Sequence, residues 1–171
     1  MNRSFNLKPL SLATIATLSL ILGCFQPAYA GTADPRIKAA LDKAGLQYEI
    51  TSDGDFKVVF KFEDKRTQLI LINSNTERLK ETNMEIREIY SVAYKTSGNL
   101  PVEVANQLMK DSQKRKIGAW ELINTNSGTS LAIFDAKIGA DISNDNLMKV
   151  MRLVAIRADN MEQELTGEDK F

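Results

Sequence analysis

Phe56-Lys-Val-Val-Phe-Lys-Phe62 is the stretch that decides the fold. Apart from Val59, its apolar residues alternate with lysine, and a period of two is typical of a strand with one buried face. The stretch follows Ser52-Asp-Gly-Asp55, which is a hairpin turn signal, and a shorter apolar segment from Gln47 to Thr51 lies before that turn. The sequence therefore predicts that an antiparallel hairpin begins a sheet.

Further strands are expected along the chain. Residues 66–73 contain four consecutive apolar residues, which favours a central strand covered on both sides. Residues 84–95 fit the period of a helix as well as that of a strand, but their β-branched and aromatic residues favour a strand. Between these two segments, the polar residues 73–83 are interpreted as a loop or a ragged strand end. Residues 119–124 and 129–136 predict a second hairpin.

Three helices are expected, and the first of them is short. Asp34 can cap a helix over residues 35–44, in which Pro35 suits the first position. The second helix is expected to begin at Pro101 and to end at Gly118. Four residues at helical spacing are expected to form its buried stripe: Val102, Ala105, Leu108 and Met109.

The third helix follows Ser143, which can cap it, and is long. Leu147, Met151, Val154, Ala158, Met161 and Leu165 form one apolar stripe along it. Val150, Leu153 and Ile156 widen this stripe beyond what one sheet usually covers, and they are a candidate partner interface. The end of the chain, residues 167–171, is expected to be frayed.

The predicted order is therefore helix, four strands, helix, two strands, helix (α-β-β-β-β-α-β-β-α). Helices packed on an antiparallel sheet make this an α+β protein. No internal repeat and no linker interrupts the sequence after residue 30, so we expect a single domain over residues 31–171.

Residues 1–30 have the pattern of a secretory signal peptide, with two basic residues before an apolar run. Ala28-Tyr-Ala30 followed by Gly31 predicts cleavage between Ala30 and Gly31, which would release a soluble protein into the periplasm or the medium. Ile21-Leu-Gly-Cys24 resembles a lipobox, in which Cys24 would be acylated and would anchor a lipoprotein. Both outcomes stay open, and membrane contact is expected only through the signal peptide or this anchor.

Composition restricts the function. The chain has no histidine and one cysteine, which excludes imidazole bases, histidine-containing triads and zinc sites built on several thiolates. Its 22 basic and 22 acidic residues balance, which argues against a nucleic-acid-binding protein. We therefore expect no catalytic residue, no cofactor and no metal, and a protein that is not an enzyme. The less favoured alternative is a hydrolase that uses carboxylates or lysine.

One cluster of basic residues stands out from this balanced charge. Lys110, Lys114, Arg115 and Lys116 are interpreted as complementing the negative end of the second helix. Trp120, the only tryptophan, is interpreted as a core or interface residue.

Several local features together resemble the YbjN-like domains, a family of bacterial sensory transduction regulators with the fold of type III secretion chaperones. The matching pieces are Ala44-Gly45, Ser52-Asp-Gly-Asp55, Leu100-Pro101, Gly118-Ala-Trp-Glu-Leu122 and Ala158-Asp-Asn-Met-Glu162. The resemblance implies a type III secretion chaperone-like fold. It also implies a non-enzymatic regulatory or chaperone-like protein that binds another protein, as yet unidentified, and that commonly forms a homodimer.

Overall fold

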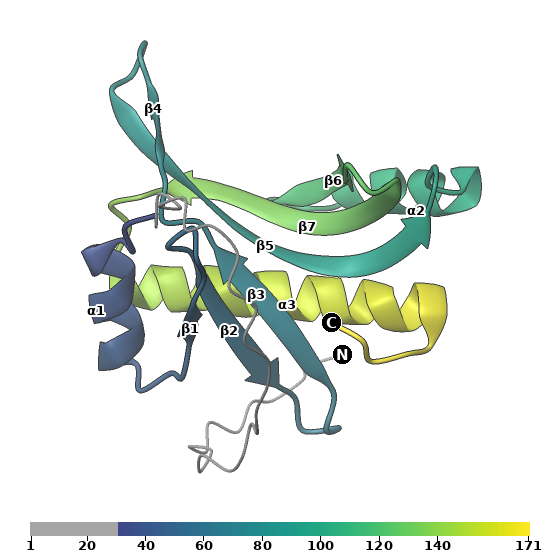
Figure 1. Cartoon of the computed structure of the whole chain (residues 1–171), viewed down its shortest axis with the longest axis horizontal. Coiled ribbons are helices and arrows are strands. Elements are labelled where there is room, and N and C mark those ends of the chain that lie inside the picture. Colours follow the sequence, from purple (N-terminus) through teal and green to yellow (C-terminus); the bar gives the residue numbers. More distant parts are fainter. Residues whose placement is uncertain (1–30) are drawn as a thin grey trace, which may run out of the picture.

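The computed structural model describes residues 31–171, which form an α+β domain with three helices and one antiparallel sheet of seven strands (Figure 1). The predicted signal peptide, including Cys24 and Ala30, lies outside the described residues. The helices are α1 (Pro35–Lys43), α2 (Val102–Ser112) and α3 (Asn144–Thr166). The strands are β1 (Glu49–Ile50), β2 (Phe56–Lys61), β3 (Thr67–Ile72), β4 (Glu77–Leu79), β5 (Met84–Ser97), β6 (Ala119–Asn124) and β7 (Thr129–Gly139).

The sheet has the order β1-β2-β3-β5-β7-β6, with β4 paired to the start of β5. The α+β class and the strand assignment of residues 84–95 are confirmed. Strand β4 was not predicted, because it lies in the polar segment 73–83, so five strands rather than four precede α2. Together β4 and the start of β5 form a hairpin that projects beyond the rest of the sheet (Figure 1).

The predicted caps begin α1 and α3. The Asp34 carboxylate accepts a hydrogen bond from the backbone N–H of Arg36 at 2.7 Å, and the Ser143 hydroxyl accepts one from the N–H of Asn146 at 3.3 Å. Each bond satisfies a donor that the first helical turn leaves free. Helix α3 then packs against β3, β5 and β7, and Figure 1 shows it running along the length of the sheet.

Two apolar clusters form the core. The larger one joins α1 and α3 to strands β2, β3, β5 and β7, with Phe56, Ile70 and Phe134 among its fully buried members. The smaller one joins α2, β5, β7 and α3 through Ala93, Leu108, Ala132, Ala158 and Met161. The predicted stripe of α3 supplies residues to both clusters, which is why this helix is apolar over most of its length.

Strand β3 is covered differently from the prediction. Ile70 and Ile72 are fully buried in the larger cluster. Leu69 and Leu71 point to the opposite side of the sheet and are half-buried, and within residues 31–171 they belong to neither cluster. The described helices therefore cover one side of this strand, and the predicted cover on both sides is not found among these residues.

Helix α2 also differs from the prediction. It ends at Ser112, six residues before Gly118. Of its predicted buried stripe only Leu108 is buried, whereas the side chains of Val102 and Met109 are 68% and 73% exposed. The helix lies at the margin of the sheet and packs through Val104 and Leu108, so its inward side is rotated away from the predicted one.

The predicted frayed end is instead docked on the sheet. The N–H of Thr67 donates to the Asp169 carboxylate at 3.1 Å, and the N–H of Leu69 donates to the carbonyl oxygen of Phe171 at 3.0 Å. The N–H of Lys170 donates to the Glu162 carboxylate at 2.6 Å. The prediction was wrong because the contacts that hold this short polar segment come from β3, about a hundred residues earlier.

The candidate interface on α3 is partly used by the domain itself. Val150 is 8% exposed and belongs to the larger core cluster, while Leu153 and Ile156 are half-buried against that cluster. Val150 is thus a core residue, and only its two neighbours keep accessible surface. Within residues 31–171, no helix combines the length and the apolar character that crossing a membrane requires.

Candidate functional site

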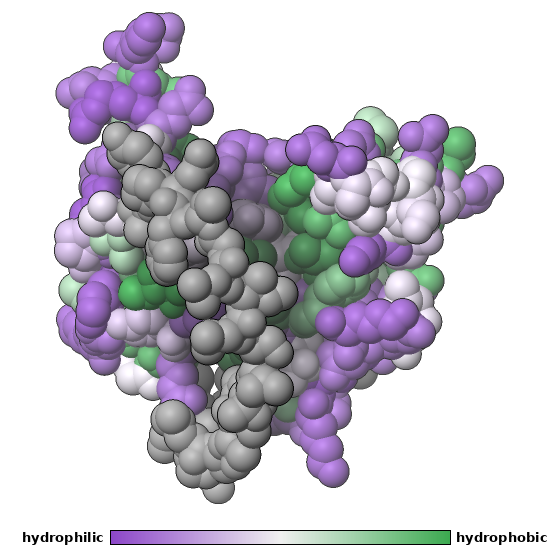
Figure 2. Space-filling model, in the orientation of Figure 1, coloured by the Kyte–Doolittle hydropathy of each residue, from purple (hydrophilic) through white to green (hydrophobic). Residues whose placement is uncertain are grey.

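Exposed apolar side chains concentrate at one end of the molecule. Among residues 31–171, nine large hydrophobic side chains are exposed, and five of them lie between residues 102 and 123. They are Val102 and Met109 on α2, Ile117 on the connecting segment, and Leu122 and Ile123 on β6. We call these five residues the α2–β6 surface. Figure 2 shows apolar surface in the same half of the molecule where Figure 1 places α2 and β6.

Trp120 positions β6 against α2. Its ring packs edge-on against Phe134 with 5.1 Å between the centroids, and its Nε1–H donates to the Asp111 carboxylate at 2.8 Å. Its backbone N–H donates to the Ser112 hydroxyl at 2.9 Å. Trp120 contacts both core clusters, in agreement with its interpretation as a core residue, and it joins the last turn of the helix to the start of the strand.

Gly118 makes this approach possible. Its φ is +77°, in the left-handed region that favours glycine. A Cβ atom at this position would lie 2.7 Å from a ring carbon of Phe134 and 2.8 Å from the carbonyl oxygen of Asp135. Gly118 therefore lets the chain enter β6 close to β7, rather than ending the helix as predicted.

One side of α2 lies along the edge of β6. Ser112 reaches the backbone of Trp120, and Met109 lies one turn before Ser112 on the same side of the helix. Val102 lies two turns before Met109, also on this side. On β6, Leu122 shares the side-chain direction of Trp120 and therefore points toward the helix side of the sheet. Val102, Met109 and Leu122 are thus the exposed apolar residues that α2 and β6 carry on this side, and we call them the apolar strip.

The opposite side of α2 is polar and faces α3. There, a groove of about 640 Å³ separates the two helices. It is lined by Glu103, Asn106, Gln107, Lys110, Asp111, Lys114, Arg115, Met161 and Glu164. The amide of Gln107 donates to Glu164 at 3.0 Å, which ties the helices together across the groove. The two sides of α2 therefore differ in chemistry, with apolar residues toward β6 and charged residues toward α3.

The basic cluster is arranged differently from the prediction. Lys114, Arg115 and Lys116 follow the end of α2 instead of forming its last turn. The guanidinium of Arg115 donates to Asp111 at 2.9 Å between Nε and Oδ2. Although burial raises the pKa of Asp111, the hydrogen bonds from Arg115 and Trp120 lower it more, so the net pKa lies below its usual range. This carboxylate is held ionised as a structural acceptor.

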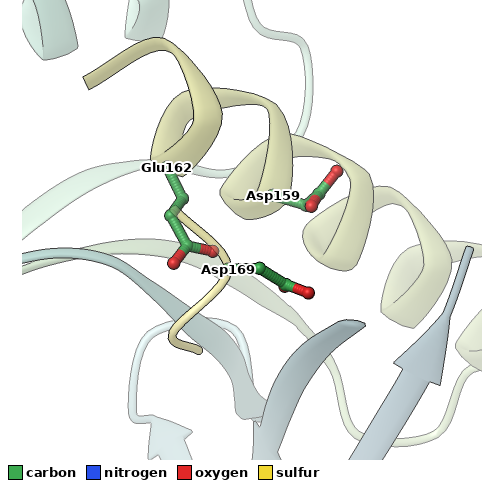
Figure 3. Close-up of side chains that lie close together, drawn as sticks. All are labelled: Asp159, Glu162 and Asp169. Atoms are coloured by element: carbon green, nitrogen blue, oxygen red, sulfur yellow. The ribbon is translucent and has the colours of Figure 1, made fainter. Parts of the chain in front are cut away.

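Three acidic side chains lie close together at the end of α3. Figure 3 shows Asp159 and Glu162 projecting from the helix and Asp169 from the segment after it. Their oxygen atoms lie within 4.8 Å of one another, a spacing that could suit a metal ion. Arg66 enters this cluster from the β2–β3 turn, with 2.6 Å from its Nε to Asp159 and 3.4 Å from its Nη2 to Glu162.

The carboxylates of this cluster already have protein partners. Asp159 and Glu162 are fully buried, and the Arg66 side chain is 12% exposed. Backbone N–H groups satisfy Glu162 and Asp169. Burial raises the pKa of Glu162, and the nearby Lys170 N–H and Arg66 oppose this rise. The cluster is thus best explained as an ionic clamp that fixes the end of the chain to α3 and β3.

The sequence did not identify the α2–β6 surface. The residues it selected, Val150, Leu153 and Ile156, lie on α3 and are not part of that surface. Val102 and Met109 did stand out as apolar residues at helical spacing, but they were assigned to the core. Leu122 and Ile123 are adjacent apolar residues in the predicted strand 119–124, so one of them points to each side of the sheet. This apolar pair was the signal that the sequence offered.

Neither the family models nor the curated proteins searched give a match to this chain.

Proposed function

We propose that this protein is an exported, non-catalytic protein-binding module, of a regulatory or chaperone-like kind, that contacts its partner through the α2–β6 surface. One observation carries the proposal: five of the nine exposed large hydrophobic side chains of residues 31–171 lie between residues 102 and 123. Contiguous exposed apolar residues with a polar rim are typical of protein interfaces. The charged groove on the other side of α2 supplies part of that rim.

The proposal includes the properties that the resemblance to YbjN-like domains implies, namely a non-enzymatic role and a homodimer. The pairing of acidic residues with arginines supports a binding role over the alternative, a hydrolase that uses carboxylates. In the described part of the chain, Arg66 engages the Asp159 and Glu162 pair, and Arg115 engages Asp111. Carboxylates that are paired with arginine in this way have a structural role. General acid/base catalysis would instead need a group within reach of the substrate.

Export is the second part of the proposal, with release after cleavage between Ala30 and Gly31. The alternative is a lipoprotein acylated at Cys24. Intact mass spectrometry of the protein isolated from its native host separates them. A mature chain that begins at Gly31 supports soluble export, and a chain that begins at a diacylated or triacylated Cys24 supports the anchor. A chain that begins at Met1 would contradict both.

Binding is tested by crosslinking the protein in the cell envelope and isolating it through a C-terminal tag. Met109→Glu and Leu122→Lys each place a charge in the apolar strip, and the loss of one well-packed contact is expected to reduce partner capture about tenfold. Val59→Lys is the matched control, because Val59 is 56% exposed but lies on β2 at the other end of the sheet. Capture that is the same in the wild type and both surface variants would overturn the proposal.

A further inference from the structure

The outer edge of β6 is open to pairing with another strand. It is the last strand of the sheet, and five of its six residues are exposed. An edge strand presents main-chain donors and acceptors to any strand that approaches it. No proline interrupts β6, and its only charged residue is Glu121. Apart from Glu121, β6 itself therefore carries no charge or proline that would prevent strand addition.

The hydrogen bonds around β6 show which of its main-chain groups point outward. The N–H of Thr125 donates to the carbonyl oxygen of Thr129 at 2.8 Å, and the pairing with β7 continues from there without a register shift. Bonded residues alternate in an antiparallel pair, so Ile123 and Glu121 bond to β7. The N–H and C=O groups of Leu122 and Asn124 then point away from the sheet.

Trp120 supports this assignment independently. It has the same parity as Leu122 and Asn124, and its N–H does point away from β7, where it donates to the Ser112 hydroxyl. Helix α2 therefore closes the first outward position of the edge. The open part of the edge is the segment from Leu122 to Asn124.

We infer that this segment pairs with the same segment of a second copy of the chain, as an antiparallel β6–β6 ladder centred on Ile123. This inference rests on the proposed function, because it uses the same surface and names the partner. In this register, Leu122 of each copy bonds to Asn124 of the other. The four outward N–H groups and the four outward C=O groups then all find partners. Ile123 faces Ile123 of the second copy across the two-fold axis.

The register also avoids the contacts that would oppose pairing. Glu121 lies opposite Thr125 of the second copy, so the two carboxylates are not opposed. A ladder centred on Leu122 would instead place Trp120 opposite Asn124, where the Trp120 N–H is already bonded to Ser112. Centring on Ile123 is thus the arrangement that uses every open group of the edge.

Both sides of the sheet gain apolar contact in this arrangement. On the outer side, Ile123 meets its counterpart beside Leu131, which is its neighbour on β7. On the helix side, Leu122 of each copy lies close to the two-fold axis, and the strip of Val102 and Met109 extends along the same edge. An isologous contact of this kind buries the same patch on both copies, and here it covers Leu122 and Ile123 of the α2–β6 surface.

Cysteine crosslinking tests the register. The chain from Gly31 to Phe171 contains no cysteine, so each introduced thiol is unique. Directly opposed, non-hydrogen-bonded residues in an antiparallel pair have Cα atoms about 4.5 Å apart, within the range that a disulfide spans. Oxidised Ile123→Cys is expected to run as a covalent dimer on a non-reducing gel. Glu121→Cys is the matched control: it lies on the same strand and side but is displaced by four residues from its counterpart, so it should stay monomeric.

A second pair of variants tests the main-chain bonds without relying on a thiol. Leu122→Pro removes an outward N–H that β7 does not use, and a proline is tolerated at such an edge position. Leu122→Thr shortens the side chain and keeps the N–H. Light scattering is expected to show a monomer for the proline variant and a weakened dimer for the threonine variant, with unchanged circular dichroism in both.

The outcomes separate this inference from the proposed function. A wild-type protein that is monomeric at tens of micromolar, or equal crosslinking of Glu121→Cys and Ile123→Cys, would overturn the β6–β6 pairing. If envelope capture still depended on Met109 in that case, binding of another protein through the α2–β6 surface would stand, and the homodimer would be excluded from the proposed function. Specific crosslinking through Ile123 together with capture that ignores Met109 would support the pairing and overturn binding of another protein through this surface.

Discussion

The two ends of the sheet are built in opposite ways. At one end the edge strand β1 has only two residues, and the N–H of Gly31 bonds to the Ser52 carbonyl beside it at 3.1 Å. At the other end β6 has six residues, most of them exposed. A short edge next to other chain segments resists pairing, whereas a longer and more apolar edge permits it. Among residues 31–171, β6 is therefore the more open of the two edge strands.

A buried ion pair fixes the β1 end. At the β1 end, Arg87 is 1% exposed and forms an ion pair with Asp34, whose backbone N–H donates to the Ser74 hydroxyl at 3.0 Å. Arg87 also donates to the carbonyl oxygens of Asn73 and Ser74. This network fixes the start of α1 to β5 and to the segment after β3. The β6 end contains the exposed apolar strip, and the buried charge beside it is Asp135 on the neighbouring strand β7.

The largest expected effect comes from breaking the Asp34–Arg87 pair. Arg87→Met removes the buried guanidinium that bonds to Asp34 and to the carbonyl oxygens of Asn73 and Ser74. Arg36 still bonds to Asp34 in this variant, but the loss of the three Arg87 contacts should lower the free energy of unfolding by about 3–5 kcal/mol. Urea unfolding followed by circular dichroism measures this. Arg78→Met, on the exposed hairpin, is the control and should change stability by less than about 0.5 kcal/mol. A loss below about 1 kcal/mol for Arg87→Met would show that the pair does not hold this end together.

Removing the docked end of the chain should have the next largest effect. Deletion of residues 168–171 eliminates three hydrogen bonds from backbone N–H groups, and a longer one from the Thr67 hydroxyl, that join Asp169, Lys170 and Phe171 to the domain. At about 0.5–1.5 kcal/mol each, we expect a loss of about 2 kcal/mol in the free energy of unfolding. Lys170→Ala keeps the backbone bond to Glu162 and should change little. An unchanged urea midpoint after the deletion would contradict the docking.

Acid should weaken the β1 end through Asp34. Burial raises the pKa of Asp34, but hydrogen bonds from Arg36 and Arg87 outweigh burial and hold the pKa well below its usual range. A lowered carboxyl pKa stabilises the fold above the ordinary value near 4, and this contribution is lost as the pH falls further. Between pH 4 and pH 2 we expect a loss of up to about 1.4 kcal/mol per pH unit from this group.

Comparison with Asp34→Asn checks this expectation. The variant is less stable at neutral pH, and its free energy of unfolding should fall less steeply between pH 4 and pH 2 than that of the wild type. Equal slopes for the two proteins would assign the acid sensitivity to other carboxyl groups.

The smallest effect is expected at the β6 end. Met109→Glu and Leu122→Lys replace exposed side chains, so each should change the free energy of unfolding by less than about 0.5 kcal/mol. Leu108→Ala lies on the inward side of the same helix and should cost about 2–5 kcal/mol. Thermal unfolding of the three variants tests the contrast. A large loss for Met109→Glu would mean that this residue stabilises the domain rather than a contact with a partner.

Local patterns predicted most of the fold. The alternation from Phe56 onward gave β2, and Asp34 and Ser143 cap α1 and α3 as expected. These features depend on neighbouring residues alone, because hydrophobic period and capping are set within a few positions. The α+β class followed from the order of these elements.

The remaining features depend on contacts between distant parts of the chain. Helix α2 has apolar residues on two sides, and which side turns inward depends on where the sheet ends, so the α2–β6 surface could not be recognised from helical spacing. Residues 167–171 have no periodicity, and they are ordered by contacts with β3 and with Glu162 on α3. Arg87 gave no signal either, since its partner Asp34 lies 53 positions away.

The docked end of the chain also determines how the protein can be immobilised. Phe171 bonds to Leu69 on β3, which is three strands away from β6 in the sheet, or roughly 14 Å at the usual strand spacing. A flexible tag attached after Phe171 therefore leaves the molecule from the β3 region rather than from the edge of β6. Protein captured on a sensor chip through such a tag would present Met109, Leu122 and Ile123 to the solution, so binding could be measured without the support covering that edge.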